Sequence, residues 1–289
     1  MSQPTFLRAL IISGIFFVAS HFPQLGQAND AQSIVSIGGS VTEIVYALGQ
    51  EDRLVARDTT SSFPEAAKNL PDVGYMRRLS PEGVLSVSPD LIVAEDGAGP
   101  IETIAVLEQA SIPFVSIPDE FSREGVVKKI KAVGEALGVA DDGYALAADI
   151  EAQLIAAEDV VNNIAKEDRL RVIFILSTGG GRINASGTNT AANGIIEMAG
   201  GVNVISDFEG YKQLSDEAVS ALAPDVILMM DRGGDHGAAN EELFAMPALQ
   251  GTPAVENERV IRMNGLYLLG FGPRTANAIT DLNQALYGS

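Results

Sequence analysis

Short apolar runs alternate along the chain with stretches in which apolar residues recur every three or four positions. The runs predict four strands in the first half, at Ile34–Ile37, Leu54–Ala56, Leu91–Ala94 and Phe114–Ile117, and four in the second, at Arg171–Leu176, Val202–Ile205, Val226–Met230 and Val260–Met263. Helices are predicted at Val41–Leu48, which ends before Gly49, and from Thr275 to Leu286, just after Pro273. Alternating strands and helices are typical of α/β folds with mainly parallel sheets.

The longest helical pattern, Gly143–Lys166, lies between the two halves and contains no proline and no internal glycine. Six apolar residues recur on one of its faces: Leu146, Ile150, Leu154, Ala157, Val161 and Ile164. At 1.5 Å per residue this helix is about 36 Å long, enough to cross a small domain. We predict a rigid spine that joins two lobes; the alternative is an ordinary packing helix within one lobe.

One sequence phrase occurs twice without a gap, at Leu79–Ile92 and at Leu214–Ile227. Each copy predicts a serine N-cap, an acidic first turn, a short helix and a Pro-Asp turn into an apolar strand. A single repetition at this distance predicts two similar α/β lobes with a ligand cleft between them. The predicted division is an N-terminal lobe at 29–141, a spine helix at 142–167 and a C-terminal lobe at 168–289.

Residues 1–28 have the pattern of a secretory signal peptide. An apolar stretch from Ala9 to Ser20 follows Arg8, and Gly26-Gln27-Ala28 is a small-residue cleavage pattern before Asn29. We expect export to the periplasm and cleavage before Asn29, with an uncleaved anchor as the alternative. No cysteine follows the apolar stretch, so attachment of a lipid to an N-terminal cysteine is excluded.

Charge and composition exclude several classes of function. A formal net charge of −19 argues against binding to nucleic acid or to anionic membranes, because both would repel the chain. The chain has no cysteine, hence no disulfide, no thiolate nucleophile and no zinc–sulfur site. Of its two histidines, His21 lies in the signal segment and His236 in a glycine-rich loop. A nucleophile–base pair is therefore missing, and we expect a protein that is not an enzyme.

Basic residues are few, and two of them follow a tyrosine in Gly74-Tyr75-Met76-Arg77-Arg78. Arginine favours the phenolate form of a nearby tyrosine, phenolate oxygen binds ferric iron, and guanidinium binds carboxylates. The alternative is a surface tyrosine with two solvated arginines. Arg232 after a predicted strand and Arg274 before the last helix are two further candidate ligand cations.

Gly38-Gly39-Ser40 connects a predicted strand to a predicted helix and offers a weak anion-binding signal, for which an ordinary turn is the better interpretation. Gly179-Gly180-Gly181-Arg182 predicts a flexible loop at the cleft edge.

Taken together, these residues resemble the periplasmic haem-binding proteins of bacterial haem-uptake ABC transporters. The resemblance covers nearly the whole mature chain and is carried by Ser36–Ile44, Val73–Arg77, Leu79–Asp90 and Leu266–Arg274. The Gly-Tyr-x-Arg element is specific to haem binding, whereas the other phrases are shared with binding proteins for vitamin B12 and siderophores.

The resemblance implies that haem b, the transported ligand, is bound through Tyr75 as an axial ligand of its iron. Arg77 would pair with a propionate or with the phenolate, and Arg232 would lie near the iron-bound tyrosine. Arg78, which follows Arg77 in the same loop, is a further candidate ligand-binding cation from the sequence. Glu82 and Glu217 would dock on arginines of an inner-membrane ABC permease, with helix-dipole stabilisation as the alternative role. The protein would be a monomer; the resemblance leaves open whether an outer-membrane haem receptor supplies the haem and whether His236 holds a second one.

Two other interpretations remain at this point. A siderophore or corrinoid receptor on the same scaffold would read its ligand with aromatic walls, and this chain has no tryptophan and 6% aromatic residues. The other interpretation, a secreted α/β enzyme, is disfavoured because the chain lacks a nucleophile–base pair. If Tyr75 does not bind the iron, Tyr211 and Tyr267 are the next candidates.

Overall fold

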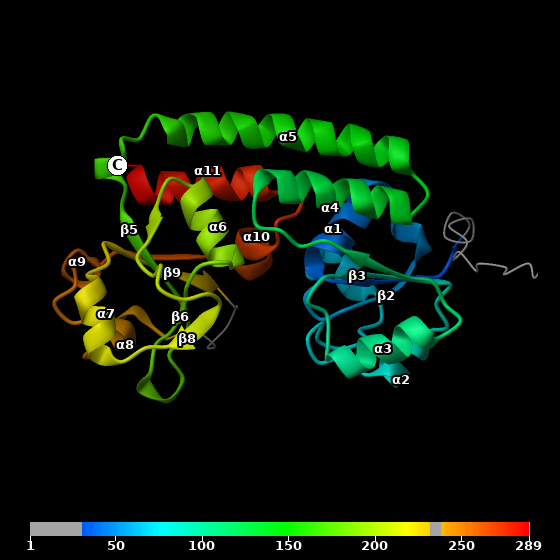
Figure 1. The fold of residues 1–289 in the computed structure, drawn as a ribbon, viewed down its shortest axis with the longest axis horizontal. Helices are drawn as coiled ribbons and strands as arrows, with labels where there is room; N and C mark the ends of the chain where they lie inside the picture. The colour runs from blue at the N-terminus through cyan, green and yellow to red at the C-terminus, as the bar shows by residue number, and fades with distance from the viewer. Residues whose placement is uncertain (1–30, 232–237, 289) are drawn as a thin grey trace, which may run out of the picture.

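The computed structural model describes residues 31–231 and 238–288, which form two α/β lobes beneath one long helix (Figure 1). The predicted signal segment, Arg232 and His236 lie outside the described residues. Within the described ranges, no helix combines the length and apolar character that a membrane crossing requires.

The N-terminal lobe is built on a four-stranded parallel sheet of order β2-β1-β3-β4. Its strands are β1 (Ile34–Ile37), β2 (Leu54–Arg57), β3 (Leu91–Glu95) and β4 (Phe114–Ile117). Alternate strand residues serve the two faces of the sheet. Ile34 and Val93 pack beneath α1 (Gly39–Ala47) and α4 (Arg123–Ala136). Val35 and Ile92 pack against α2 (Pro81–Leu85) and α3 (Ile101–Gln109).

The C-terminal lobe has a six-stranded sheet of order β10-β9-β5-β6-β8, with β7 also paired to β5. Its strands are β5 (Arg171–Ser177), β6 (Asn184–Ser186), β7 (Val202–Asn203), β8 (Tyr211–Gln213), β9 (Val226–Asp231) and β10 (Val260–Asn264). The parallel strands β7-β5-β9-β10 repeat the order of the first lobe. β6 and β8 are antiparallel additions that the sequence pattern did not predict, so this sheet is mixed.

Helices cover both faces of the second sheet. They are α6 (Ala191–Met198), α10 (Gly265–Leu269) and α11 (Thr275–Tyr287) on the side of the long helix, and α7 (Asp216–Leu222), α8 (Asn240–Phe244) and α9 (Pro253–Glu256) on the opposite side. Four short 3-10 helices occupy connections, at Glu51–Arg53, Glu65–Asn69, Lys166–Asp168 and Gly179–Gly181.

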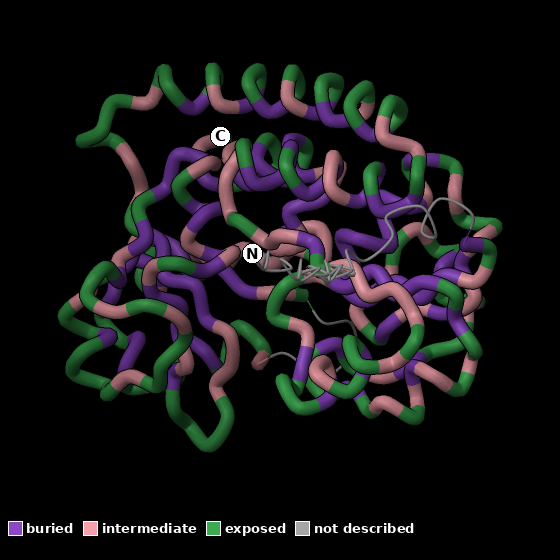
Figure 2. The backbone as a smooth tube through the Cα atoms, turned by 45° about the vertical axis from the view of Figure 1, so that its right-hand side comes forward, coloured by how far each residue is buried: buried purple, intermediate pink, exposed green. Residues whose placement is uncertain are grey.

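The long helix α5 (Ala140–Asn162) runs over both lobes and packs on α4 and on α11 (Figure 1). Its first residue lies three positions before the predicted start, Gly143, and its last residue lies four positions before the predicted end, Lys166. Its inner face is buried and its outer face is exposed along its whole length (Figure 2). α4 and α5 approach closely at two glycines, because a Cβ atom on Gly134 would lie 2.8 Å from the Cα atom of Gly143.

A single hydrophobic cluster under α5 extends through both lobes. It joins β-strand residues of each sheet to the inner face of α5 and to α11, as shown by Ile34, Leu154, Phe174 and Ile279. The opposite faces of the two sheets have separate clusters, one in each lobe. The lobes are therefore joined on the side of α5 by a common core.

The duplicated phrase has the same local structure in both lobes. Ser80 caps α2 by accepting the Gly83 N–H at 3.0 Å, and Ser215 caps α7 by accepting the Ala218 N–H at 3.3 Å. The aspartates of the two Pro-Asp turns also make equivalent contacts. Asp90 accepts the Gln32 N–H just before β1, and Asp225 accepts the Arg171 N–H at the start of β5. Both capped helices lie on the side of the molecule opposite α5 (Figure 1).

Candidate functional site

The loop Gly74–Arg78 lies between β2 and α2 and is held by its backbone. Gly74 has φ +106, a conformation that favours glycine. The Arg78 N–H donates to the Tyr75 carbonyl at 2.7 Å, and the Gly99 N–H donates to the Met76 carbonyl at 2.8 Å. The Met76 side chain is buried, so the loop is anchored at its middle residue while its neighbours face outwards.

Tyr75, Arg77 and Arg78 are all exposed, with 43% of Tyr75 accessible. Within the described part of the chain, none of these three side chains forms a hydrogen bond or an ion pair. The structure thus brings the three predicted site residues together on one loop and leaves a phenol and two guanidinium groups free for a ligand.

The hydroxyls of Tyr267 and Tyr287 form hydrogen bonds within the protein. The Tyr267 hydroxyl donates to Asp281 at 2.7 Å, and burial together with this carboxylate raises the pKa of Tyr267 well above its usual range. The Tyr287 hydroxyl donates to the Gly200 carbonyl at 2.8 Å and accepts the Leu170 N–H at 3.0 Å.

In Tyr46, Tyr144 and Tyr211 the phenolate form is also disfavoured. Desolvation of the hydroxyl group raises the pKa of Tyr46 and of Tyr211, although the Tyr211 residue as a whole is exposed. A hydrogen bond to Glu135 raises the pKa of Tyr144. Tyr75, Tyr144 and Tyr211 are the exposed tyrosines among the described residues, and of these three only Tyr75 has a hydroxyl without a hydrogen bond to another described residue.

Tyr211 marks the second side of the site. It lies on β8 of the C-terminal lobe, with its ring edge-on to Phe174 at 6.4 Å and its hydroxyl bonded to those of Ser186 and Thr190. The positive charge of Arg77 partly offsets the raised pKa of Tyr211. Arg77 belongs to the N-terminal lobe and Tyr211 to the C-terminal lobe, so this charge acts from one lobe on the other. Sequence reasoning named Tyr211 only as a reserve iron ligand.

Arg274 does not face this site as a free cation. Its guanidinium donates to both carboxylate oxygens of Glu43, at 2.8 Å each, and lies over the ring of Phe63 at 3.6 Å. Glu43 is on α1 and is almost fully buried. The sequence predicted a ligand-binding cation, whereas the structure shows an ion pair between the two lobes.

The phrases Ser36–Ile44 and Leu266–Arg274 meet in what we call the lobe interface, formed by Gly39, Ser40, Glu43 and Lys129 on one lobe and by Leu266, Gly270, Gly272 and Arg274 on the other. A Cβ atom on Gly39 would lie 2.5 Å from Leu266 Cδ1 of the other lobe and 2.7 Å from the Thr60 carbonyl oxygen, so a side chain does not fit there. These two parts of the family resemblance are therefore accounted for by contact between the lobes.

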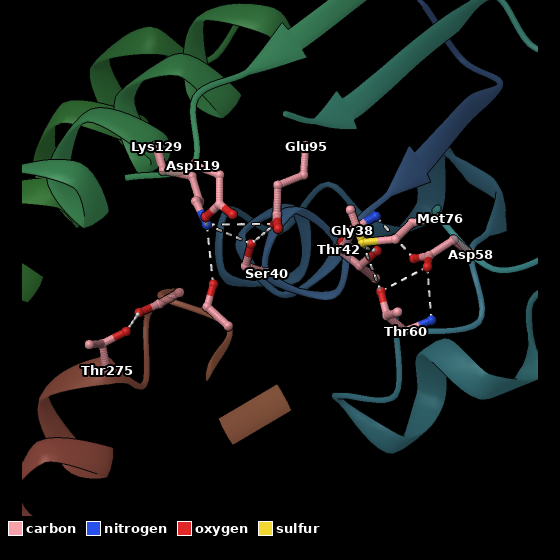
Figure 3. Close-up of polar contacts among 12 residues, drawn as sticks. Gly38, Ser40, Thr42, Asp58, Thr60, Met76, Glu95, Asp119, Lys129 and Thr275 are labelled. Carbon is pink, nitrogen blue, oxygen red and sulfur yellow. Dashed lines mark hydrogen bonds and ion pairs between the residues drawn. The ribbon is translucent and has the colours of Figure 1, made fainter. Parts of the chain in front are cut away.

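The turn at Gly38-Gly39-Ser40 holds an anion that the protein itself supplies. Asp58 is fully buried and accepts the Gly38 N–H at 3.0 Å, at the N-terminus of α1. The same carboxylate accepts hydrogen bonds from the Thr60 backbone N–H and hydroxyl, at 2.8 and 2.7 Å (Figure 3). It also accepts the Ser61 hydroxyl at 2.7 Å. The sequence analysis did not single out Asp58, because its partners are assembled only in the fold.

Glu82 and Glu217, the predicted permease-docking residues, are exposed on the first turns of α2 and α7. A hydrogen bond from its own backbone N–H, with a further one from Ser215, lowers the pKa of Glu217. Among the described residues, no group of three or more metal-binding side chains could hold a metal ion.

The two-lobe α/β fold with one long connecting helix is the architecture of a class of binding proteins. Residues 34–265 match the family model described as periplasmic binding protein, and the chain belongs to this family.

Its solved relatives include two periplasmic haem-binding proteins. It is 39% identical to BhuT in complex with two haems, covering 88% of this chain and 97% of that one with a TM-score of 0.83. It is 40% identical to RhuT from Roseiflexus sp. RS-1, covering 89% and 98% with a TM-score of 0.84. A vitamin B12-binding protein of Vibrio campbellii is 29% identical, over 87% of this chain and 88% of that protein.

Proposed function

We propose that this protein captures ferric haem in the periplasm and delivers it to an inner-membrane ABC permease. The observation that carries the proposal is the Tyr75 loop, Gly74–Arg78, in which an exposed phenol stands beside two exposed arginines. Within the described residues, none of these three side chains forms a hydrogen bond or an ion pair. Ferric haem presents a Lewis-acidic iron, two carboxylates and an apolar macrocycle. A phenolate suits the iron and guanidinium groups suit the propionates.

In this assignment Tyr75 is the axial ligand, and Arg77 and Arg78 bind propionates or stabilise the phenolate. Tyr211 supplies an aromatic group on the opposite lobe. The remaining surface is strongly acidic overall, so the pair of free arginines is a local attraction for an anionic ligand. The similarity to two haem-binding proteins at 39% and 40% identity supports this ligand class.

A titration of purified protein with hemin, followed by visible absorption, tests the proposal. The wild type should develop the charge-transfer band of ferric tyrosinate haem. Tyr75→Phe keeps the ring and removes only the oxygen, so we expect it to lose the band and at least tenfold in affinity, about 1.4 kcal/mol. Tyr144→Phe, an exposed tyrosine on α5, is the matched control and should behave as wild type. Retention of the band by Tyr75→Phe would assign the iron to another residue.

A corrinoid ligand is the second candidate, because curated relatives at 27–29% identity are vitamin B12-binding proteins. Titration with cyanocobalamin separates the two. Binding of cyanocobalamin with no response to hemin would replace the haem assignment.

The repeated glutamates support delivery to a permease. Glu82 and Glu217 are exposed at equivalent places of the two lobes, on the side opposite α5, as expected for a surface that meets a two-fold partner. We infer docking on permease arginines through this pair.

A further inference from the structure

The lobe interface contains a fully buried charge, the ammonium group of Lys129 on α4 (Figure 3). Its Nζ atom lies 2.6 Å from Asp119 Oδ1, 3.0 Å from Ser40 Oγ and 3.6 Å from Glu95 Oε2, all in the N-terminal lobe. It also donates to the carbonyl oxygen of Gly270 at 3.1 Å. Gly270 belongs to the other lobe, so this one ammonium group connects the two.

The backbone that Lys129 holds is fixed on its other side as well. Phe271, the next residue, has φ +48, a conformation that a bulky side chain adopts only when its surroundings enforce it. Its ring is buried and packs edge-on against Phe121 of the N-terminal lobe at 5.4 Å. The Gly270 carbonyl therefore has one position relative to Lys129.

The N-lobe partners of Lys129 also support the Tyr75 loop. Ser40 lies in the first turn of α1. Gly38, just before this turn, donates its backbone N–H to the Asp58 carboxylate. The same carboxylate accepts the Thr60 hydroxyl, which contacts the sulfur of Met76 at 3.9 Å. Figure 3 shows this polar network on both sides of the N-terminus of α1. A chain of contacts thus leads from Gly270 of one lobe to the residue next to Tyr75 in the other.

We propose that Lys129 is a positioning residue for the ligand site. By holding the Gly270 carbonyl against the N-terminal turn of α1, it sets the distance between the Tyr75 loop and the opposite lobe that carries Tyr211. The expected effect of Lys129 on ligand release rests on the proposed function, haem binding. The expected effect of Lys129 on the distance between the lobes does not depend on any ligand.

The geometry can be measured in the protein without ligand. The chain has no cysteine, so Glu108→Cys on α3 and Glu242→Cys on α8 place one spin label on each lobe. Both positions are exposed. In this background, Lys129→Met removes the ammonium group at similar side-chain length. Lys128→Met removes the neighbouring exposed ammonium group, whose partner Glu120 lies 2.5 Å away, and is the matched control.

We expect Lys129→Met to shift the inter-label distance or at least double the width of its distribution by pulsed dipolar spectroscopy, and Lys128→Met to leave it unchanged. A distribution identical to that of the parent in folded Lys129→Met would overturn the proposal.

Because the single variant leaves Asp119 and Glu95, whose side chains are 14% and 12% exposed, without their cation, a second variant guards against failure to fold. Lys129→Met with Asp119→Asn and Glu95→Gln removes all three charges at nearly constant volume, and we expect the same broadening. An unchanged distance distribution in this triple variant would also overturn the proposal.

Ligand release supplies a readout that loss of stability alone would not move. Transfer of hemin to apomyoglobin should be at least fivefold faster from Lys129→Met, with an unchanged absorption spectrum because Tyr75 is intact. Faster release with unchanged inter-label distances would assign the effect to local damage and overturn the positioning role. If the wild type does not bind hemin, the proposed function fails, and the distances still decide the role of Lys129.

Discussion

Replacing Arg274 with methionine tests whether this residue joins the lobes or serves the ligand. The guanidinium forms two 2.8 Å hydrogen bonds with a carboxylate that is 7% exposed, and 27% of the Arg274 side chain remains accessible. Removing one partner of a fully buried ion pair costs about 3–5 kcal/mol, because the other charge is left unpaired. The partial exposure of Arg274 lowers this value, while loss of the cation–π contact with Phe63 adds about 0.5–1 kcal/mol. We expect a loss of about 2–4 kcal/mol in the free energy of unfolding.

Urea unfolding followed by far-UV circular dichroism measures this loss. Arg182→Met is the control, because within the described residues this exposed arginine forms no ion pair. A double-mutant cycle with Glu43→Gln isolates the pairwise energy, which we expect to exceed about 1 kcal/mol for a contacting pair. A loss below about 1 kcal/mol for Arg274→Met, in the range of surface substitutions and pairs, would refute the interlobe role.

Four other outcomes follow from the site and its surroundings. Arg77→Ala should weaken hemin binding in a titration by about 1–3 kcal/mol, the range of a charge-assisted hydrogen bond, and an unchanged affinity would remove it from the site. Reversing Glu82 and Glu217 to lysine should leave hemin binding intact while haem-dependent ATPase stimulation of the reconstituted transporter falls; unchanged stimulation would reduce them to helix-dipole acids. His236→Ala should keep the affinity for the first haem, because ordering a ligand between glycines is entropically unfavourable, and a tenfold loss would make it an axial ligand. Burial, opposed by Lys129, raises the pKa of Glu95, so ionised Glu95 destabilises the fold and this loss grows as pH rises above the ordinary carboxyl range. Urea unfolding at pH 5 and pH 8 should show Glu95→Gln gaining stability relative to wild type at the higher pH; a relative loss would show that the ion pair outweighs the desolvation of Glu95.

Elements with a strong local pattern could be predicted from the sequence. The strands Ile34–Ile37 and Phe114–Ile117 agree with the structure to the residue, because each is a short apolar run within a parallel sheet. The inner face of α5 was also predicted correctly at Ile150, Leu154 and Val161. In contrast, β6 and β8 are three residues each, and every residue of β8 is exposed, so no hydrophobic pattern identifies them.

In the candidate site, too, residues that are close in sequence could be predicted, and residues brought together only by the fold could not. Tyr75, Arg77 and Arg78 are adjacent in sequence, so their proximity required no knowledge of the fold. Lys129 is one of three lysines among residues 128–131, and its sequence context does not distinguish it from the exposed Lys128. Its partners lie 10, 89 and 141 residues away along the chain.

The ion pair of Arg274 could not be predicted for the same reason. Its partner Glu43 is 231 residues distant. The sequence shows that a cation is present, but only the tertiary structure shows which carboxylate it meets.

The common core under α5 also constrains how the chain acquires its structure. The inner face of α5 packs against α11, which ends at Tyr287, two residues from the end of the chain. Until α11 is synthesised, the second half of α5 lacks one of the apolar surfaces against which its inner face packs, and burial of that face stays incomplete. In a chain delivered from its N-terminus, the common core under α5 is therefore complete only after α11 has arrived.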